Sequence, residues 1–363
     1  MPPVNQIPVT LLVRPNTLTT RAPHAGLAPR FVPRCSTKKI LHEPMTSEPQ
    51  LNLALRYHSF GNPRDVLKLE SSQLVQRSAD ALRVRMTCAP INPSDIIPVT
   101  GAYRHLTTPP KTAGYEGFGR VVEASPQFAH LLGQRVLPLR GDGTWQRYVD
   151  CDPEIAVPVP DSISDSLAAR GYINPLSAQF LLQKWPVANK RVIITGAGSN
   201  IAALLIQWAQ ADGAAQITGI YRSPERRDRL ETLGVLPVAE RDIYSVDAEA
   251  READITFDAV GGPVGSRILN RMRLGTECVG YGLLSGQPVL PDSQNTAAHR
   301  RFHLRDELSK LDPEAWQNCF LSIWPRLAAA KLQEIQRIPF EDWQKALDLF
   351  EMPGRAHKPM LQF

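Results

Sequence analysis

Residues 190–214, KRVIITGAGSNIAALLIQWAQADGA, place a compact apolar strand before a glycine-containing turn and an apolar-faced helix. Gly196 and Gly198 lie in the turn, and the pattern predicts that the helix begins near Ser199. A strand, a tight turn and a helix in this order open a βαβ unit. Strands continue to alternate with helices up to about residue 284. This part of the chain is therefore predicted to form a parallel, doubly wound sheet.

The glycine turn is suited to binding a dinucleotide. Backbone N–H groups at a helix N-terminus can approach a pyrophosphate closely only where no side chain intervenes. The strict G-x-G-x-x-G pattern is not met, because Ile201 and Ala202 follow Ser199 and Asn200. Asn200 tolerates the left-handed conformation and Ala202 is small, so the turn remains feasible. A tight strand-to-helix turn that binds no ligand is the alternative.

The end of the next strand favours a phosphorylated cofactor. An NAD-binding unit normally ends this strand with an acid that holds the ribose 2′-hydroxyl, whereas here it ends with Tyr221 and Arg222. Arg222 and Arg226 offer forked donors for a 2′-phosphate, and Tyr221 can flank the adenine. The residues therefore favour NADPH over NADH. The alternative is a solvated basic helix start whose arginines pair with Glu225 and Asp228.

The residues ahead of this unit follow a different pattern. The segment DALRVRMTCAPIN (80–92) alternates Leu82, Val84 and Met86 with polar residues, which is typical of a half-exposed strand. Further short apolar runs bounded by Gly or Pro predict a small β-rich barrel or sandwich. After residue 284 a helix-rich tail follows, which indicates that the chain returns to the first part. The cleft between the two parts is the expected site.

The net charge of +5 comes from residues 1–44, where six Arg and Lys residues stand against Glu43. Because no folded region carries an excess of positive charge, we exclude nucleic acid as a partner. These residues are rich in Pro and Arg, and they are either a disordered targeting leader or an extension ahead of a start at Met45. We expect a mitochondrial protein in the first case and a cytoplasmic one in the second.

Membrane spans and cysteine-based metal sites are not expected. No apolar run approaches the roughly 20 residues that a membrane helix needs. The cysteines are scattered singly, without the C-x-x-C spacing of metal ribbons and redox motifs. We therefore expect free thiols at Cys35, Cys88, Cys151, Cys278 and Cys319.

The order of motifs resembles the medium-chain dehydrogenase/reductase superfamily. Within it, the chain is similar to the zinc-free enoyl reductase and quinone oxidoreductase branch, in particular the mitochondrial-type trans-2-enoyl-CoA reductases. The motifs that support this resemblance are INPSDI (91–96), GAYRHL (101–106), GYEGFGRVV (114–122), GTWQRY (143–148), GYINPLSAQFLL (171–182), FDAVGG (257–262) and VGYGLLSGQPV (279–289).

The resemblance implies an α/β chain in which a doubly wound Rossmann domain is inserted into a GroES-like β-barrel catalytic domain. It covers about residues 51–363. The expected domains are the disordered leader or extension at 1–44, the N-terminal part of the catalytic domain at 45–165, the NADPH-binding Rossmann domain at 166–294, and the return segment at 295–363 that completes the catalytic domain.

The resemblance also implies an active site without a metal. Tyr115 occupies the position that is a histidine in zinc-dependent members, directly before Glu116, so neither zinc site can be built. Tyr103 matches a tyrosine whose hydroxyl stabilises the substrate enolate or donates a proton; the alternative is a turn tyrosine that seals the barrel rim. Asn92 and Asp95 match residues near the nicotinamide, although Asp95 is equally suited to capping the following turn.

The remaining expected site residues bind the cofactor. Asn174 and Ser177 match positions at the nicotinamide end, and glycines at the strand ends match close backbone approaches. The full cofactor set is Asn174, Ser177, Gly196, Gly198, Ser199, Asn200, Ile201, Tyr221, Arg222, Arg226, Gly261, Tyr281 and Gly282, with Tyr103 and Asn92 as catalytic residues.

One segment departs from the enoyl reductase pattern. The related reductases carry tryptophans where this chain has RRFHLRDEL (300–308), so the wall on the acyl side is altered. Arg104, Arg300 and Arg301 either meet the phosphates of CoA or are simply solvated. Trp145 is expected to pack between the two domains.

The implied function is NADPH-dependent transfer of hydride to the β-carbon of a trans-2-enoyl thioester, without zinc. A quinone or another α,β-unsaturated carbonyl is the alternative substrate, because the same geometry serves it. A non-catalytic sensor or structural protein that binds NADPH is a second alternative. The resemblance further implies a homodimer acting on a small-molecule substrate.

Overall fold

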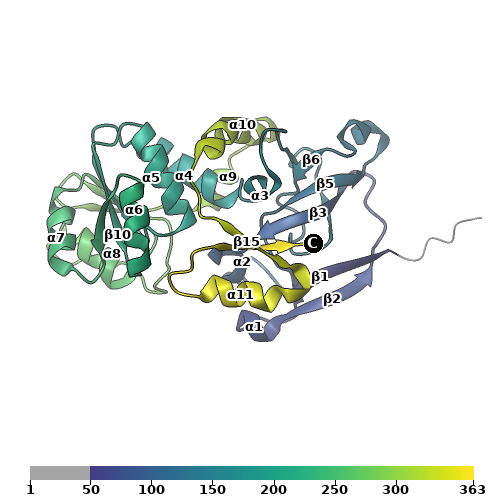
Figure 1. Cartoon of the computed structure of the whole chain (residues 1–363), viewed down its shortest axis with the longest axis horizontal. Helices are drawn as coiled ribbons and strands as arrows, with labels where there is room; N and C mark the ends of the chain where they lie inside the picture. Colours follow the sequence, from purple (N-terminus) through teal and green to yellow (C-terminus); the bar gives the residue numbers. More distant parts are fainter. Residues whose placement is uncertain (1–49) are drawn as a thin grey trace, which may run out of the picture. The chain divides into compact units, whose positions relative to one another are not determined.

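The computed structural model describes residues 50–363 (Figure 1). The predictions for residues 1–44, a targeting leader or an upstream extension, lie outside the described residues. Within the described range the strands form three sheets of three, six and seven strands, and helices connect and cover them. This mixture of sheets and helices confirms the predicted α/β class.

The six-stranded sheet is entirely parallel. Its strands are β9 (Arg191–Thr195), β10 (Gln216–Tyr221), β11 (Leu236–Ala239), β12 (Ile255–Asp258), β13 (Glu277–Gly280) and β14 (Ala298–Arg301). Their order is β11-β10-β9-β12-β13-β14, so the direction of winding reverses between β9 and β12. Doubly wound sheets bind ligands beyond the strand carboxyl ends at such a reversal. The predicted doubly wound sheet is confirmed.

Helices cover both faces of this sheet (Figure 1). They are α5 (Asn200–Ala211), η2 (Pro224–Arg226), α6 (Arg227–Thr232), α7 (Ile243–Glu252) and α8 (Gly262–Leu269). Successive side chains of a strand point to opposite sides. Val192 and Ile194 of β9 accordingly share a hydrophobic cluster with α5, while Ile193 clusters with α7 and α8. The helix after the glycine turn begins at Asn200, one residue from its predicted start.

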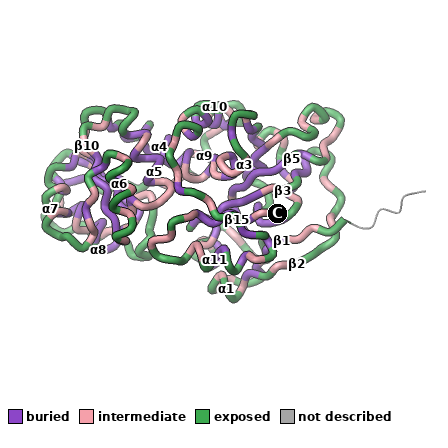
Figure 2. Tube along the Cα trace, in the orientation of Figure 1, coloured by how far each residue is buried: buried purple, intermediate pink, exposed green. Residues whose placement is uncertain are grey.

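The other strands form the β-rich part of the chain. They are β1 (Leu51–Tyr57), β2 (Leu67–Gln73), β3 (Leu82–Pro90), β4 (Lys111–Thr112), β5 (Phe118–Glu123), β6 (Arg135–Leu137), β7 (Tyr148–Cys151), β8 (Val157–Pro158), β15 (Ile335–Pro339) and β16 (Lys358–Gln362). One sheet has the order β15-β16-β3-β5-β6-β8, with β7 paired to β3, and the other is β2-β1-β4. β3 and β5 are largely buried (Figure 2). Because β16 pairs with β3, the tail returns to the first part as expected.

Helix α4 connects the β-rich part to the parallel sheet. The helices outside the sheet's own units are α1 (Pro63–Val66), α2 (Pro93–Ile96), η1 (Pro126–Leu131), α3 (Asp165–Ala168), α4 (Ile173–Lys184), α9 (Leu304–Leu308), α10 (Pro313–Ala329), η3 (Phe340–Asp342) and α11 (Trp343–Glu351). Leu176 of α4, Leu204 of α5, Phe118 of β5 and Phe320 of α10 belong to one hydrophobic cluster. A continuous core therefore joins the two parts.

The predicted end of the Rossmann domain at residue 294 falls too early. β14 pairs in parallel with β13 and extends the sheet to Arg301. Its side chains are mostly exposed, because it is the edge strand, so its sequence AHRR lacks the apolar signal of the inner strands. The boundary at 165/166 stays a prediction.

The expectation that Trp145 packs between the domains is wrong. Its side chain is fully buried in a cluster that contains Leu55 and Tyr57 of β1 and Phe340 of η3. All of these residues belong to the β-rich part. Trp145 therefore stabilises the core of that part alone.

No helix in the described part of the chain is long and apolar enough to cross a membrane.

Gly143 provides a test of the close approach beside Trp145. A Cβ at this position would overlap the backbone carbonyl oxygens of Thr112 and Ala113, and backbone atoms cannot move aside cheaply. We expect Gly143→Ala to lower the free energy of unfolding in urea by about 1–3 kcal/mol.

The matched control for this change is Gly280→Ala, at the end of β13. The nearest atom to its added Cβ is 3.6 Å away, an ordinary contact. Equal stability of the Gly143 variant and wild type would contradict the packing described for this turn.

Candidate active site

Asp95 closes the turn that starts α2. Its Oδ2 accepts a hydrogen bond from the Asn92 backbone N–H at 2.7 Å, which forms a capping box. Its Oδ1 accepts from the Tyr115 backbone N–H, also at 2.7 Å. The capping role proposed for Asp95 is thus confirmed, and the same carboxylate fixes the backbone at Tyr115, the position that is histidine in zinc-dependent relatives.

Glu116 connects this turn to the start of α4. The side chain is only 1% exposed. Its Oε1 accepts from Asn92 Nδ2 at 2.6 Å, and its Oε2 accepts from the Ile173 backbone N–H at 2.9 Å. The Thr144 hydroxyl donates to the Glu116 backbone carbonyl at 2.8 Å. Glu116 therefore holds three separate segments together.

Lys358 completes the network, and the sequence did not indicate it. It begins β16 and is 2% exposed. Its ammonium donates to the Ile91 carbonyl at 2.9 Å and to Asn92 Oδ1 at 2.7 Å. The only signal was a lysine ahead of the short apolar run PML near the chain end. Because its partners lie about 266 residues earlier in the chain, no local motif could identify them.

Burial shifts the pKa values of all three charged groups. Burial, aided by the nearby Glu116 carboxylate, raises the pKa of Asp95 to about 7. Burial also raises the pKa of Glu116, while Lys358 acts to lower it. The pKa of Lys358 falls to about 8 because burial disfavours the ammonium, although Glu116 opposes this shift.

Asn92, Asn174 and Ser177 are brought together at the start of α4. Asn174 Nδ2 donates to Asn92 Oδ1 at 3.4 Å, so Asn92 has partners at both ends of its amide. Asn92 is 2% exposed, whereas Asn174 is half-buried. The Ser177 hydroxyl donates to the Ile173 carbonyl within α4 at 2.7 Å. Of these three side chains, Asn174 is the most accessible to a ligand.

Tyr103 lies in a second cluster of side chains. Its ring centroid is 6.4 Å from those of His105 and His303, and the Arg305 guanidinium lies 5.9 Å from the ring centre. Burial raises the pKa of Tyr115, and the nearby Arg305 guanidinium opposes this shift. The Tyr103 hydroxyl makes no hydrogen bond to another residue in the range 50–363. His303 and Arg305 come from the segment 300–308 that departs from the related reductases; the sequence reasoning marked this segment but neither residue.

The glycine turn has the geometry that a cofactor site needs. Gly196 has φ +59°, and the Ser199 hydroxyl caps α5 by accepting from the Ala202 N–H at 3.3 Å. A Cβ on Gly198 would lie 2.7 Å from the Cγ and Cδ atoms of Arg226. Gly198 is therefore needed because the stem of Arg226 crosses directly over the turn.

Four arginines gather near this turn. None of them forms an ion pair with a carboxylate among the described residues. Burial lowers the pKa of each guanidinium, and for Arg229 and Arg355 the neighbouring Arg226 lowers it further. Arg226 donates to the Arg355 carbonyl at 2.7 Å. The four are Arg170, Arg226, Arg229 and Arg355.

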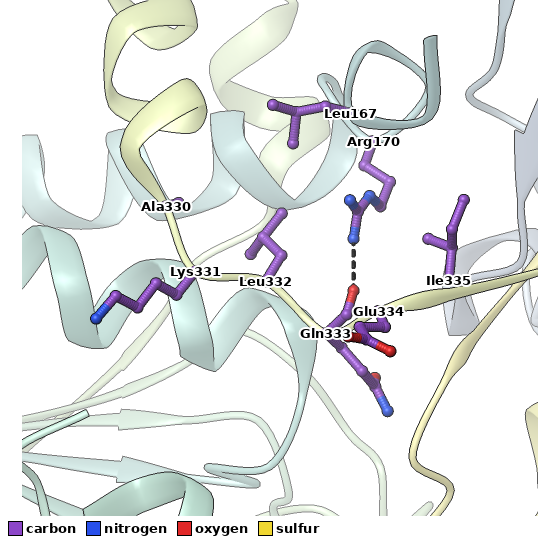
Figure 3. Close-up of a pocket in the computed structure, with 8 residues that line it drawn as sticks. All are labelled: Leu167, Arg170, Ala330, Lys331, Leu332, Gln333, Glu334 and Ile335. Atoms are coloured by element: carbon purple, nitrogen blue, oxygen red, sulfur yellow. Dashed lines mark hydrogen bonds between the residues drawn. The ribbon is translucent and has the colours of Figure 1, made fainter. Parts of the chain in front are cut away.

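A cleft of about 650 Å³ adjoins this arginine cluster (Figure 3). Arg170 donates to the Gln333 carbonyl at 2.9 Å, as Figure 3 shows, and Gln333 also accepts from the Asn200 amide at 3.4 Å. The cleft is lined by Leu167, Arg170, Ala330, Lys331, Leu332, Gln333, Glu334 and Ile335. Gln333 therefore links the cleft to the first residue of α5.

The residues predicted to bind the cofactor do not all lie near the glycine turn. Tyr221 is buried at the end of β10, whereas Arg222 is exposed and makes no side-chain hydrogen bond to a described residue. Arg227 pairs with Glu231 at 2.9 Å, and not with the acids that the sequence suggested. Arg226 is thus the arginine of this segment that reaches the glycine turn.

The loops after β12 and β13 contain the other predicted glycines. Gly261 precedes α8 with φ +68°, and its N–H donates to the buried Asp258 carboxylate. A Cβ on Gly282 would lie 2.7 Å from the Ala259 carbonyl oxygen. The Tyr281 hydroxyl is buried without a partner among residues 50–363. Asp258, which the sequence reasoning did not select, is the residue that shapes the loop after β12.

The described part of the chain contains free cysteines and no group of candidate metal ligands. Cys88, Cys151, Cys278 and Cys319 are free thiols, and burial raises the pKa of each, while Cys35 lies outside the described residues. In the described part of the chain, no three His, Cys, Asp or Glu side chains are grouped so that they could hold a metal ion.

Comparisons with known proteins agree with this arrangement. The family model for the alcohol dehydrogenase GroES-like domain matches residues 78–161. The mitochondrial enoyl-[acyl-carrier-protein] reductase of Xenopus tropicalis is 30% identical over 352 residues, which cover 89% of this chain and 98% of that protein. The chain belongs to the zinc-free enoyl reductase and quinone oxidoreductase branch of the medium-chain dehydrogenase/reductase superfamily. It is therefore an oxidoreductase, with a GroES-like barrel and an inserted Rossmann domain.

Solved structures support the same assignment. A Bacillus thuringiensis protein, provisionally named an NADPH:quinone reductase, superposes with a TM-score of 0.80 and is 31% identical, covering 86% of this chain and 99% of its own. The protein Etr1p, solved with NADP and crotonyl-CoA, superposes with a TM-score of 0.73 at 18% identity, covering 86% of this chain and 100% of its own. The second likeness shows the fold alone.

The raised pKa of Asp95 predicts how stability depends on pH. Between about pH 4 and pH 7 the folded protein holds a proton on Asp95 that the unfolded chain, with an aspartate pKa near 3.9, releases. The contribution of Asp95 to the free energy of unfolding is therefore complete below about pH 4 and is lost as the pH rises through 7. Urea denaturation across this range should show a smaller decrease for Asp95→Asn than for wild type.

Asp242→Asn is the matched control, because this exposed cap has a lowered pKa. Its contribution has the opposite sign and is lost as the pH falls through that lowered value, below the range of the measurement. Identical pH profiles for wild type and Asp95→Asn would contradict the assignment.

Proposed function

We propose that this oxidoreductase uses NADPH to reduce the carbon–carbon double bond of a trans-2-enoyl thioester, with Tyr103 as the group that contacts the substrate carbonyl. The proposal rests on the half-buried Tyr103 side chain, whose hydroxyl has no partner among the described residues and whose ring lies near the His303 ring and the Arg305 guanidinium. The relatives named enoyl-[acyl-carrier-protein] reductases support the substrate class.

NADPH is the cofactor, and the residues present fit it. The N-terminus of α5 offers backbone N–H groups beside Gly198, a position with no room for a side chain. No carboxylate of residues 50–363 pairs with the arginine cluster, so the cluster suits an anion such as the 2′-phosphate. Arg226 is the best-placed donor because it crosses the turn. When bound, NADPH supplies the hydride.

Tyr103 stabilises the charge that the reaction creates. As hydride adds to the β-carbon, the electron pair of the double bond moves toward the thioester carbonyl and forms an enolate oxygen. A hydroxyl that donates a hydrogen bond to this oxygen lowers the barrier, because the charge is larger in the transition state than in the substrate. A proton must then reach the α-carbon, and the Tyr103 hydroxyl or a water molecule held by it supplies that proton.

A quinone or another α,β-unsaturated carbonyl is the second candidate substrate. The 31% identity to the Bacillus thuringiensis protein favours it, and the same hydroxyl would serve a quinone oxygen. The homodimer stays a prediction, as does a mitochondrial location, for which the names of the curated relatives are the only support.

Replacing Tyr103 tests the proposed reaction. With crotonyl-CoA as acceptor and NADPH absorbance as the signal, we expect Tyr103→Phe to lower kcat by about 10²- to 10³-fold, because one oxyanion donor is lost. Tyr244→Phe is the control, since Tyr244 is 84% exposed on α7. Turnover of benzoquinone but not of crotonyl-CoA by wild type would replace the thioester with the second candidate.

Replacing Arg226 tests the cofactor site. Loss of a charged hydrogen-bond donor costs about 1.5–3 kcal/mol, so Arg226→Ala should raise the Kd for NADPH by about 10- to 100-fold and leave NADH binding nearly unchanged. Arg227→Ala is the control because Arg227 is engaged by Glu231. If Arg222→Ala produces this loss and Arg226→Ala does not, Arg222 holds the 2′-phosphate and the role proposed for Arg226 is wrong.

A further inference from the structure

In the buried network near α4, the hydrogen bonds can run in only one direction, from donor to acceptor. The charged side chains at its two ends, Glu116 and Lys358, impose this direction. An ionised glutamate can only accept hydrogen bonds, and a lysine ammonium can only donate them. Glu116 and Lys358 contact opposite ends of the Asn92 amide, at 2.6 and 2.7 Å. Asn92 must therefore turn its NH2 group toward Glu116 and its carbonyl oxygen toward Lys358, because the flipped amide would place like groups together at both ends.

The same reasoning fixes the orientation of the Asn174 side-chain amide. The Asn92 carbonyl oxygen, already held by Lys358, also accepts from Asn174 Nδ2 at 3.4 Å. Asn174 thus turns its NH2 group inward. Its own carbonyl oxygen accepts no hydrogen bond from a residue in the range 50–363, and the side chain is half-buried. The accessible end of Asn174 is therefore a hydrogen-bond acceptor.

We propose that Lys358 is a positioning residue for the reductase reaction: with Glu116 it sets the direction of the Asn92 and Asn174 amides, so that Asn174 presents an acceptor to the carboxamide NH2 group of the nicotinamide. This inference rests on the proposed function, because Asn174 is expected at the nicotinamide end of the cofactor. Lys358 itself remains buried and acts only through the two amides.

The electrostatic surroundings fit this role. The ammonium of Lys358 is faced by Glu116 and Asp95, which favour its charge, and by Arg355 and Arg170, which disfavour it. With its pKa near 8, Lys358 is charged at neutral pH and loses its proton as the pH rises further. A neutral amine accepts as well as donates, so the direction of the Asn92 amide is then no longer enforced.

A double-mutant cycle tests the proposal. Lys358→Met and Asn174→Ala should each lower kcat by about 10- to 100-fold with whichever acceptor wild type reduces, since misplacing a reacting group by about 1 Å costs this much. If Lys358 acts only through Asn174, the double variant should be no slower than the slower single variant. The Kd for NADPH should change by less than about threefold, because the arginine cluster is untouched.

Three further measurements separate the outcomes. The basic limb of the pH–rate profile near pH 8 should disappear in Lys358→Met. Lys345→Met, on the exposed face of α11, is the control and should match wild type. If Lys358→Met does not fold, Lys358→Arg keeps a side chain that only donates and should retain more activity than Asn174→Ala.

A signal that does not require a reducible substrate tests the positioning role of Lys358 separately from the proposed reaction. The nicotinamide fluorescence of bound NADPH reports the environment of the ring, and it should change alike in both single variants and in the double variant. If wild type reduces no acceptor, the proposed function fails while the fluorescence cycle still tests the positioning. A folded Lys358→Met with kcat and fluorescence like wild type, or losses that multiply in the double variant, would overturn the proposal.

Discussion

The buried carboxylate of Glu116 is the contact on which the active-site region depends. It receives a hydrogen bond from Asn92 ahead of α2 and another from the first residue of α4, and Lys358 of β16 lies beside it. These segments are far apart in sequence, and each supplies one part of the site. Removing one partner of a buried charge typically costs about 3–5 kcal/mol, because the remaining charge is left without compensation. The carboxylate therefore requires the three segments to stay assembled.

This contact also determines where the cofactor can lie. The hydrogen bond to Ile173 fixes the N-terminus of α4, and α4 shares a hydrophobic cluster with α5, the helix that follows the glycine turn. Asn174 on α4 and the glycine turn ahead of α5 are thus placed by two helices of one core. The two regions differ in charge. The Glu116 network, near Asn174, contains two carboxylates and one lysine, whereas the arginines near the glycine turn pair with no carboxylate of residues 50–363. A dinucleotide with a neutral amide at one end and phosphates at the other matches this distribution.

Local patterns in the sequence were enough to predict the sheet, the turn and the start of α5, because each follows from residues within a few positions of one another. The motif resemblance added Tyr103 and Asn174 as candidate site residues, and these roles stay predictions. The local patterns did not reveal Lys358 or Arg355, because both come from the returning tail and meet their partners only through β16 and its neighbours. Arg226 was ranked with Arg222, since adjacent residues of a loop look alike in sequence; only the backbone path shows which one crosses Gly198.

The acceptor end of the site is built differently from the cofactor end. Tyr103 lies on a short turn and packs against His303 and Arg305 at the start of α9, and none of these three belongs to the buried Glu116 network. Arg305 is exposed, and its guanidinium lies near the Tyr103 ring and the Tyr115 side chain. A change of His303 or Arg305 therefore alters the surroundings of Tyr103 without removing a hydrogen bond of the Glu116 network. The relatives are named enoyl-[acyl-carrier-protein] reductase and NADPH:quinone reductase, and the surroundings of Tyr103 are the part of the site where we expect a difference in acceptor to arise.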